Sequence, residues 1–190
     1  MPGWLAMIIY TTPDDSVDDI WTKKGLISVR NFEARAKGDP NFKKSCVANP
    51  APDGAVDIVF CNNAASWNSP LSLFPNPNNL ENMTEFEIKK VLTDTIANPV
   101  LWNKGYAPFF GNEVTLTNPK VKYMRAISNH AGPIKDGTKR YENINDEKSE
   151  QAKIVTEFQK SMRDWSEDGE VQFEGVKVKI FGGLLIGVYF

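Results

Sequence analysis

The sequence has very few of the residues from which catalytic and metal centres are usually built, with one histidine and two cysteines among 190 residues. A tetrahedral zinc site needs four ligands, and two cysteines plus His130 do not supply them. A serine or cysteine nucleophile needs a base beside it, yet His130 lies in the turn-like Ser-Asn-His-Ala-Gly of residues 128–132 without a neighbouring carboxylate. Gly182-Gly183 lacks the Lys-Ser/Thr of a phosphate-binding loop. We therefore expect no enzyme and no cofactor, and a structural or surface role for His130.

Long apolar runs and basic clusters are also missing. The longest apolar run, Phe181–Phe190, is about half of the ~20 residues that a membrane helix needs. Met1-Pro2-Gly3 lacks the basic region of a signal peptide. The net charge is −2 and basic residues gather only in pairs such as Lys23-Lys24, which argues against nucleic-acid binding. Twelve prolines predict long ordered loops, more typical of extracellular domains, and such a domain would be a piece of a longer protein.

The chain is organised around its first strand and helix. The Ile-rich segment Leu5–Thr12 has strand length. An acidic turn follows, and Thr22 then stands where a helix N-cap is expected. Leu26, Val29 and Phe32/Glu33 recur at helical spacing, and Asp39-Pro40 ends the helix. The turn itself holds Asp14, Asp15, Asp18 and Asp19, a weak calcium candidate without the alternating spacing of a calcium loop. Acidic residues favoured near a helix N-terminus explain it better.

Two further helices and several strands are predicted. Thr84 and Glu87 form a capping box before a helix that ends at Asn98-Pro99. Asp146 caps a third helix whose apolar stripe ends at Trp165. Strand-like segments are Glu113–Thr117, Val121–Ile127, Val171–Ile180 with a turn or bulge at Gly175, and Phe181–Phe190. The order predicts an α+β fold with helices on one face of a mostly antiparallel sheet, and crossover helices favour a ferredoxin-like split βαβ sandwich.

Two features of the first half concern covalent modification. Cys46 and Cys61 are either two buried thiols or one disulfide, which would close a loop of about 15 residues and stabilise the fold by roughly 3 kcal/mol. Asn82-Met83-Thr84 is an N-glycosylation sequon, so Asn82 is a candidate acceptor if the domain is secreted.

An aromatic segment, Trp102–Gly111, follows the second predicted helix. It looks like a loop and carries Trp102, Tyr106, Phe109 and Phe110. Folding of these rings onto the core is the favoured interpretation. The alternative is a contact with a lipid, a cargo or a partner protein.

The first unit also carries a family resemblance. Residues 6–46 (AMIIYTTPDDSVDDIWTKKGLISVRNFEARAKGDPNFKKSC) run from a strand through an acidic loop to Ile20-Trp21-Thr22, then through a helix to Pro40-Asn41-Phe42 and Cys46. This pattern resembles the first large extracellular domain of the Patched/Dispatched-like transporters, eukaryotic relatives of the resistance-nodulation-division pumps. Later segments fit loosely in the same order: Tyr106–Phe110, Val121–Ile127 continuing to Gly132-Pro133, and Phe181–Phe190.

The resemblance implies a fold, a function and a location. Residues 1–190 would form a single extracellular or lumenal porter-like domain, with an inserted region at about 43–83 closed by the disulfide. Such a domain helps to bind or conduct an apolar cargo such as a sterol, a lipid or a lipidated protein. Its partners would be the membrane helices and the second extracellular domain of the same transporter. The alternatives are a free-standing secreted or surface interaction domain and a small enzyme whose site the sequence does not reveal.

Overall fold

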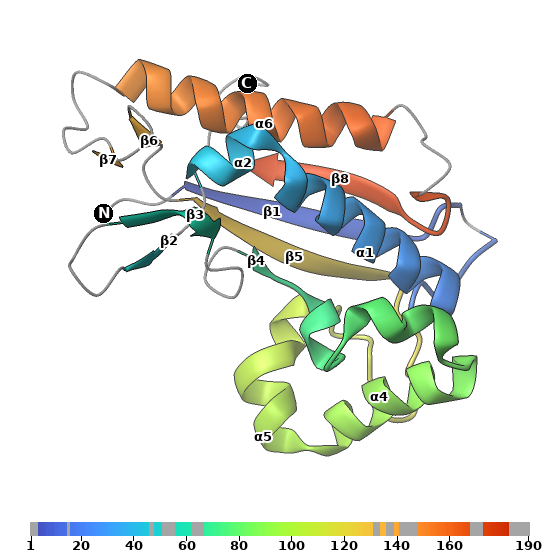
Figure 1. Cartoon of the computed structure of the whole chain (residues 1–190). Helices are drawn as coiled ribbons and strands as arrows, with labels where there is room; N and C mark the ends of the chain where they lie inside the picture. The colour runs from blue at the N-terminus through green and yellow to red at the C-terminus, as the bar shows by residue number, and fades with distance from the viewer. Residues whose placement is uncertain are drawn as a thin grey trace.

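A computed structural model describes residues 4–14, 16–45, 48–50, 56–61, 67–130, 134–135, 139–140, 148–167 and 173–182. In chain order the elements are β1 (Trp4–Thr11), α1 (Lys23–Gly38), α2 (Pro40–Ser45), β2 (Ala48–Pro50), β3 (Val56–Cys61), β4 (Trp67–Asn68), η1 (Pro70–Leu73), η2 (Pro77–Asn82), α4 (Glu85–Ala97), α5 (Pro99–Leu101), η3 (Trp102–Tyr106), η4 (Ala107–Phe109), β5 (Tyr123–His130), β6 (Ile134–Lys135), β7 (Lys139–Arg140), α6 (Lys148–Glu167) and β8 (Lys177–Gly182). Figure 1 shows their arrangement.

The central element is a four-stranded sheet in the order β4-β5-β1-β8. Every neighbouring pair is antiparallel: Ala6 of β1 lies opposite Ser128 of β5 and Gly182 of β8, and Trp67 of β4 lies opposite Ser128. Because β1 and β4 are both antiparallel to β5, they run parallel to each other, with α1 in the connection between them. By the same argument β5 and β8 run parallel across β1, and their connection contains α6.

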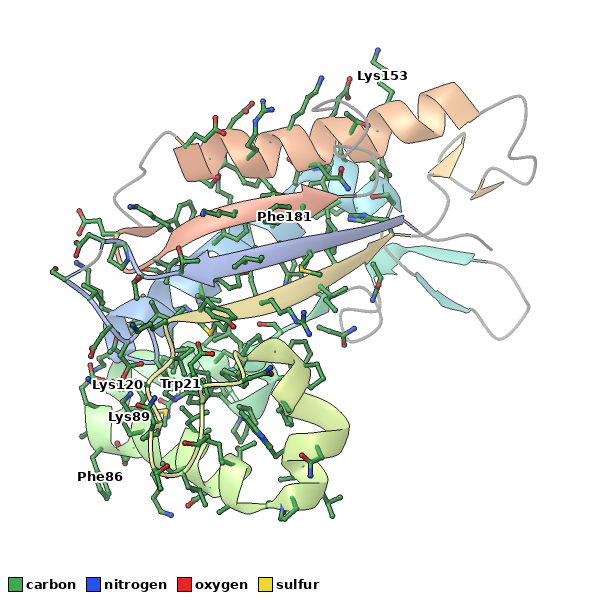
Figure 2. The ribbon with its side chains drawn as sticks, turned by 180° about the vertical axis from the view of Figure 1, so that it is seen from behind. Trp21, Phe86, Lys89, Lys120, Lys153 and Phe181 are labelled. Carbon is green, nitrogen blue, oxygen red and sulfur yellow. The ribbon has the colours of Figure 1, made fainter. Side chains whose placement is uncertain are left out.

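Helices α1, α2 and α6 lie on one face of this sheet, and Figure 2 shows the opposite face in front of them. The alternation of side chains along each strand explains the layering. Ala6, Ile8 and Tyr10 of β1 point to the helices and are fully buried. In β5, Met124 and Ala126 do the same. The core therefore lies between the sheet and the three helices.

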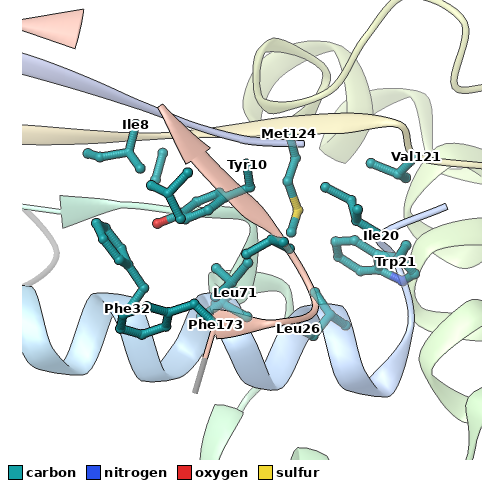
Figure 3. Close-up of a cluster of buried hydrophobic side chains, with 14 of the residues drawn as sticks. Ile8, Tyr10, Ile20, Trp21, Leu26, Phe32, Leu71, Val121, Met124 and Phe173 are labelled. Atoms are coloured by element: carbon teal, nitrogen blue, oxygen red, sulfur yellow. The ribbon is translucent and has the colours of Figure 1, made fainter. Parts of the chain in front are cut away.

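The connection between β4 and β5 forms a second unit, residues 70–122, which we call the helical lobe. It contains η1, η2, α4, α5, η3 and η4 and lies at one side of the sheet (Figure 1). Its own buried residues, including Leu71, Phe74, Leu80, Ile88 and Leu92, belong to the same hydrophobic cluster as the sheet. One continuous core thus joins the lobe to the sheet, and Figure 3 shows the part of it around Tyr10 and Trp21.

The helix boundaries follow the capping residues in the sequence. Thr22 Oγ1 accepts the backbone N–H of Gly25 at 3.1 Å, as an N-cap should. Both hydrogen bonds of the capping box between Thr84 and Glu87 are present. The backbone also turns at Gly175 before β8, where a Cβ atom would lie only 2.6 Å from the Lys24 carbonyl oxygen. The α+β class, the antiparallel sheet and these caps are confirmed.

Three local predictions are wrong. Glu113–Thr117 is not a strand, because Thr115 instead closes a turn in which its Oγ1 accepts the N–H of Asn118 at 3.1 Å. Trp102–Gly111 is largely helical rather than a loop. His130 is the last residue of β5, not part of a turn. Asp146 and most of Phe181–Phe190 lie outside the described residues, as does any pairing of Cys46 with Cys61.

The predicted insertion at about 43–83 contains elements of different kinds. It includes the hairpin of β2 and β3, but also β4, which pairs with β5 in the central sheet. The longest helical excursion from the sheet begins later, at residue 70, and continues to residue 122.

Candidate functional site

Trp21 holds the helical lobe against the sheet. Its side chain is fully buried, and its indole N–H donates to the Ile88 carbonyl of α4 at 2.9 Å. The ring stacks on Phe74 with centroids 5.7 Å apart and meets Phe110 edge to face at 5.4 Å. Just before it, the N–H of Ile20 donates to the Val121 carbonyl at 2.7 Å. Trp21 therefore ties together three segments that are distant in the sequence.

The predicted contact aromatics lie around this anchor. Phe110 is buried, and Trp102 stacks on it with centroids 5.4 Å apart. Tyr106 and Phe109 pack on each other at 6.2 Å. Trp102, Tyr106 and Phe109 are half-buried, so each keeps part of its ring accessible. The structure thus places Phe110 in the core, and the other three rings pack against the outside of the core.

The most exposed apolar side chains of this segment come just before it. Val100 is 63% exposed and Leu101 is 47% exposed. Their position follows from Asn98, whose Oδ1 accepts the N–H groups of both residues at 3.1 and 3.2 Å and so starts α5. We call Val100 and Leu101, with the adjoining ring of Trp102, the apolar tip. Sequence reasoning missed the pair because it stopped at the helix end; two apolar residues directly after Asn-Pro were the available signal.

A second exposed apolar residue marks the other end of α4. Phe86 is 76% exposed, and Figure 2 shows it pointing away from the protein. Because α4 has 13 residues, its two ends are separated by roughly 20 Å. Phe86 is therefore a distinct feature and a natural comparison for the apolar tip.

His130 is a core residue. It is 1% exposed and packs edge to face against Phe158 and Phe42. Nδ1 lies 3.0 Å from Ser45 Oγ and Nε2 lies 3.1 Å from Ser128 Oγ. Ser45 Oγ also donates to the Asn41 carbonyl, so Nδ1–H donates to Ser45 and Nε2 accepts from Ser128. Burial lowers the pKa of His130 from 6.5 to about 4, which keeps the imidazole neutral. Both ring nitrogens and both serine hydroxyls are buried away from solvent.

Glu33 is a buried carboxylate that sequence reasoning placed on the helix but did not single out. It is 2% exposed and accepts hydrogen bonds from Tyr10 at 3.3 Å and Ser69 at 2.5 Å. Lys37 Nζ lies 3.2 Å from the other carboxylate oxygen. Burial and the nearby Glu33 charge raise the pKa of Tyr10. This network joins β1, α1 and the segment after β4, and its role is structural.

Three of the four aspartates of the acidic turn are already occupied by the protein's own groups, and Asp15 lies outside the described residues. Asp14 accepts from Ser16, which lowers the pKa of Asp14. Asp18 pairs with Lys120, and that hydrogen bond lowers the pKa of Asp18. Asp19 pairs with Lys89 of α4. Among the described residues, His, Cys, Asp and Glu nowhere gather in a group of three that could hold a metal ion.

Three other features are the sequon residue Asn82, a groove beside α1 and the polarity of the helices. Asn82 is exposed and donates to Asn79 Oδ1 at 2.9 Å, so it is accessible as a glycosylation acceptor. An open groove of about 490 Å³ lies beside the start of α1, where the Glu85 carboxylate accepts the backbone N–H of Lys23. In the part of the chain that the structure describes, no helix has the length and apolar character needed to cross a bilayer.

Comparison of the chain with protein-family models, with curated proteins and with solved structures finds no match in any of the three.

Proposed function

We propose that this chain is a porter-like domain on the extracellular or lumenal face of a Patched/Dispatched-like transporter. Its role is to bind or conduct an apolar cargo such as a sterol, a lipid or a lipidated protein. The membrane helices and second extracellular domain of the same transporter are its proposed partners. In this proposal the domain performs no catalysis.

The strand order of the sheet is the observation that carries the proposal. A βαβ unit made of β1, α1 and β4 interleaves with a second one made of β5, α6 and β8, so that each unit is split by a strand of the other. This interleaving supports a ferredoxin-like split βαβ fold, which the sequence resemblance implies for a porter domain. The resemblance and the topology are separate observations, and they point to the same fold.

The apolar tip is the proposed point of contact with cargo. Contiguous exposed apolar surface marks interaction sites on otherwise polar proteins. Within the tip, Val100 and Leu101 are the most accessible residues, and the ring of Trp102 is half-buried. The half-buried rings of Tyr106 and Phe109 extend this apolar surface. Because Phe110 and Trp21 lie behind these rings, the tip has a rigid base that links cargo contact to the sheet.

Replacing Val100 and Leu101 together with serine is expected to reduce transport without unfolding the domain. Both side chains are largely exposed, so their loss costs little stability. Losing their burial against cargo removes roughly 1–2 kcal/mol, equivalent to a decrease of about tenfold. The measurement is transport of a fluorescent sterol by cells that express the complete protein, normalised to its amount at the cell surface.

Phe86→Ser is the matched control, since it removes an even more exposed apolar side chain from the far end of α4. It should transport as the unchanged protein does. Equal transport by the folded double variant would remove the apolar tip from the cargo path. A native gene that encodes no membrane helices would instead overturn the transporter assignment itself.

We also propose that Cys46 and Cys61 form a disulfide in the native protein, because an extracellular domain keeps such thiols oxidised. Titration of the denatured, unreduced protein should then detect no free thiol. Two titratable thiols per chain would contradict the disulfide and weaken the extracellular location. The same titration after reduction serves as the control and should detect both.

A further inference from the structure

The face of the sheet turned away from the helices carries an ordered set of side chains. Strand alternation and register place them in rows that cross β5, β1 and β8. One row is Ile127, Met7 and Phe181, the next is Arg125, Ile9 and Lys179, and the third is Tyr123, Thr11 and Lys177. We call these nine residues the open face. None of the described α-helices lies on it (Figure 2), and η4 meets it at Arg125, whose Nε donates to the Pro108 carbonyl.

The open face is more apolar than a solvated face needs to be. One side of an antiparallel sheet often faces water, and polar residues then dominate it. Here the row through Met7 is apolar across all three strands, and Ile9 continues it along β1. Phe181 is 49% exposed and Tyr123 is 45% exposed, while Met7, Ile9 and Ile127 are half-buried. The surface thus has an apolar row and an exposed ring at two opposite corners, Phe181 on β8 and Tyr123 on β5.

The charge of the open face has a single sign. Arg125, Lys177 and Lys179 provide three cations, and none of the nine positions holds a carboxylate, although the whole chain has a net charge of −2. None of the three forms a salt bridge to another described residue. Among the described residues, two acidic groups lie at the rim: Asp14, whose pKa is lowered first by its hydrogen bonds to Ser16 and also by the charge of Lys177, and Glu113, which accepts from Tyr123 at 3.4 Å. The centre therefore remains positive.

From this apolar centre and its flanking cations, we propose that the open face docks an acidic amphipathic helix of a partner protein. Three strands span about 10 Å, which is the width of one helix. A helix lying along β1 would bury its apolar stripe on Met7 and Ile9. Arg125 and Lys179 lie on either side of Ile9, so both flanks of that stripe would carry Asp or Glu. The docked helix would form a third layer opposite α1 and α6.

A bilayer fits this surface less well than a helix does. Met7, Ile9 and Ile127 are half-buried, so they offer an apolar floor for packing but less exposed apolar surface that could insert between lipids. The cations lie on β5 and β8, on the two sides of β1. This arrangement suits a helix with acidic residues along both flanks better than it suits the uniform negative charge of a membrane surface. The binding experiment therefore includes lipid vesicles, so that membrane binding can be told apart from binding of a helix.

The test uses the whole chain and two labelled helical peptides that share one apolar stripe. One peptide carries glutamate on both flanks, and the other carries lysine. Fluorescence anisotropy should show binding of the glutamate peptide alone. The double variant Lys177→Glu/Lys179→Glu should weaken that binding by about tenfold or more, because each attraction becomes a repulsion. Phe181→Ser should weaken it without altering the preference for glutamate.

The matched control is Lys153→Glu/Lys160→Glu, which makes the same change in net charge on α6, on the other side of the sheet. It should bind as the unchanged chain does. Equal binding of both peptides, equal weakening by the control variant, or no binding of the glutamate peptide would each overturn the proposal. The proposal would also be overturned if neither peptide bound while the chain bound phosphatidylserine vesicles and Lys177→Glu/Lys179→Glu abolished that vesicle binding.

Discussion

Replacing Trp21 with alanine is expected to lower the free energy of unfolding by about 4–6 kcal/mol. Emptying a core aromatic site typically costs about 3–5 kcal/mol, and the Ile88 carbonyl also loses its hydrogen-bond donor at a further cost of about 1 kcal/mol. For a chain of 190 residues this corresponds to a melting temperature lower by about 10 °C or more. Urea unfolding followed by circular dichroism measures the loss.

Two companion variants make this result specific. Trp21→Phe keeps a ring against Phe74 and Phe110 but removes the indole N–H, so it should lie between the alanine variant and the unchanged protein. Phe86→Ala removes an exposed ring from the same lobe and should change stability little. A loss below about 1 kcal/mol for Trp21→Ala would mean that the lobe is held to the sheet by other contacts.

Acid should destabilise the protein through His130 by about 3 kcal/mol between pH 7 and pH 4. The folded protein holds the pKa of His130 at about 4, below the 6.5 of an unperturbed histidine, because burial disfavours the charged ring. As pH falls through 6.5, the unfolded chain takes up a proton that the folded protein does not. The stabilisation present above pH 6.5 is therefore lost progressively as pH falls to about 4.

The control for this effect is His130→Gln, compared with the unchanged protein by urea unfolding at several pH values. Glutamine does not titrate, and the chain has no other histidine, so the carboxylates contribute equally to both profiles. The variant is expected to be less stable at pH 7 but to lose less stability on acidification. Parallel profiles would show that His130 is not held neutral by the fold.

The parts of the fold that depend on neighbouring residues could be predicted from the sequence. Thr22 and Thr84 begin helices because each can cap the first turn with its own side chain. The apolar stripes on the first and second helices are buried where their periodicity requires, with Leu26, Val29, Ile88 and Leu92 in the core. Capping and periodicity act over a few residues, so the sequence displays them directly.

The parts that depend on distant residues could not be predicted in the same way. Thr115 is a different case, because a turn held by its hydrogen bonds to Asn118, only three residues away, replaces the predicted strand. His130 has one partner on its own strand, Ser128, but the rest of its surroundings come from Ser45 and Phe158 on other elements. The exposure of Val100 and Leu101 depends on how the helical lobe packs on Trp21. The open face likewise exists only through the pairing of β1, β5 and β8, which are distant in the sequence.

The central position of β1 has a consequence for how the protein is made. β1 leaves the ribosome before the other described strands, yet its described partners are β5 and β8, and Ala6 pairs with the distant Gly182. At 5–20 residues per second, the ribosome needs on the order of ten seconds or more to complete both partners. During that time the Ile-rich strand has no sheet to join. Contacts between such distant residues also form slowly, so newly made chains should depend on chaperones that shield exposed apolar strands.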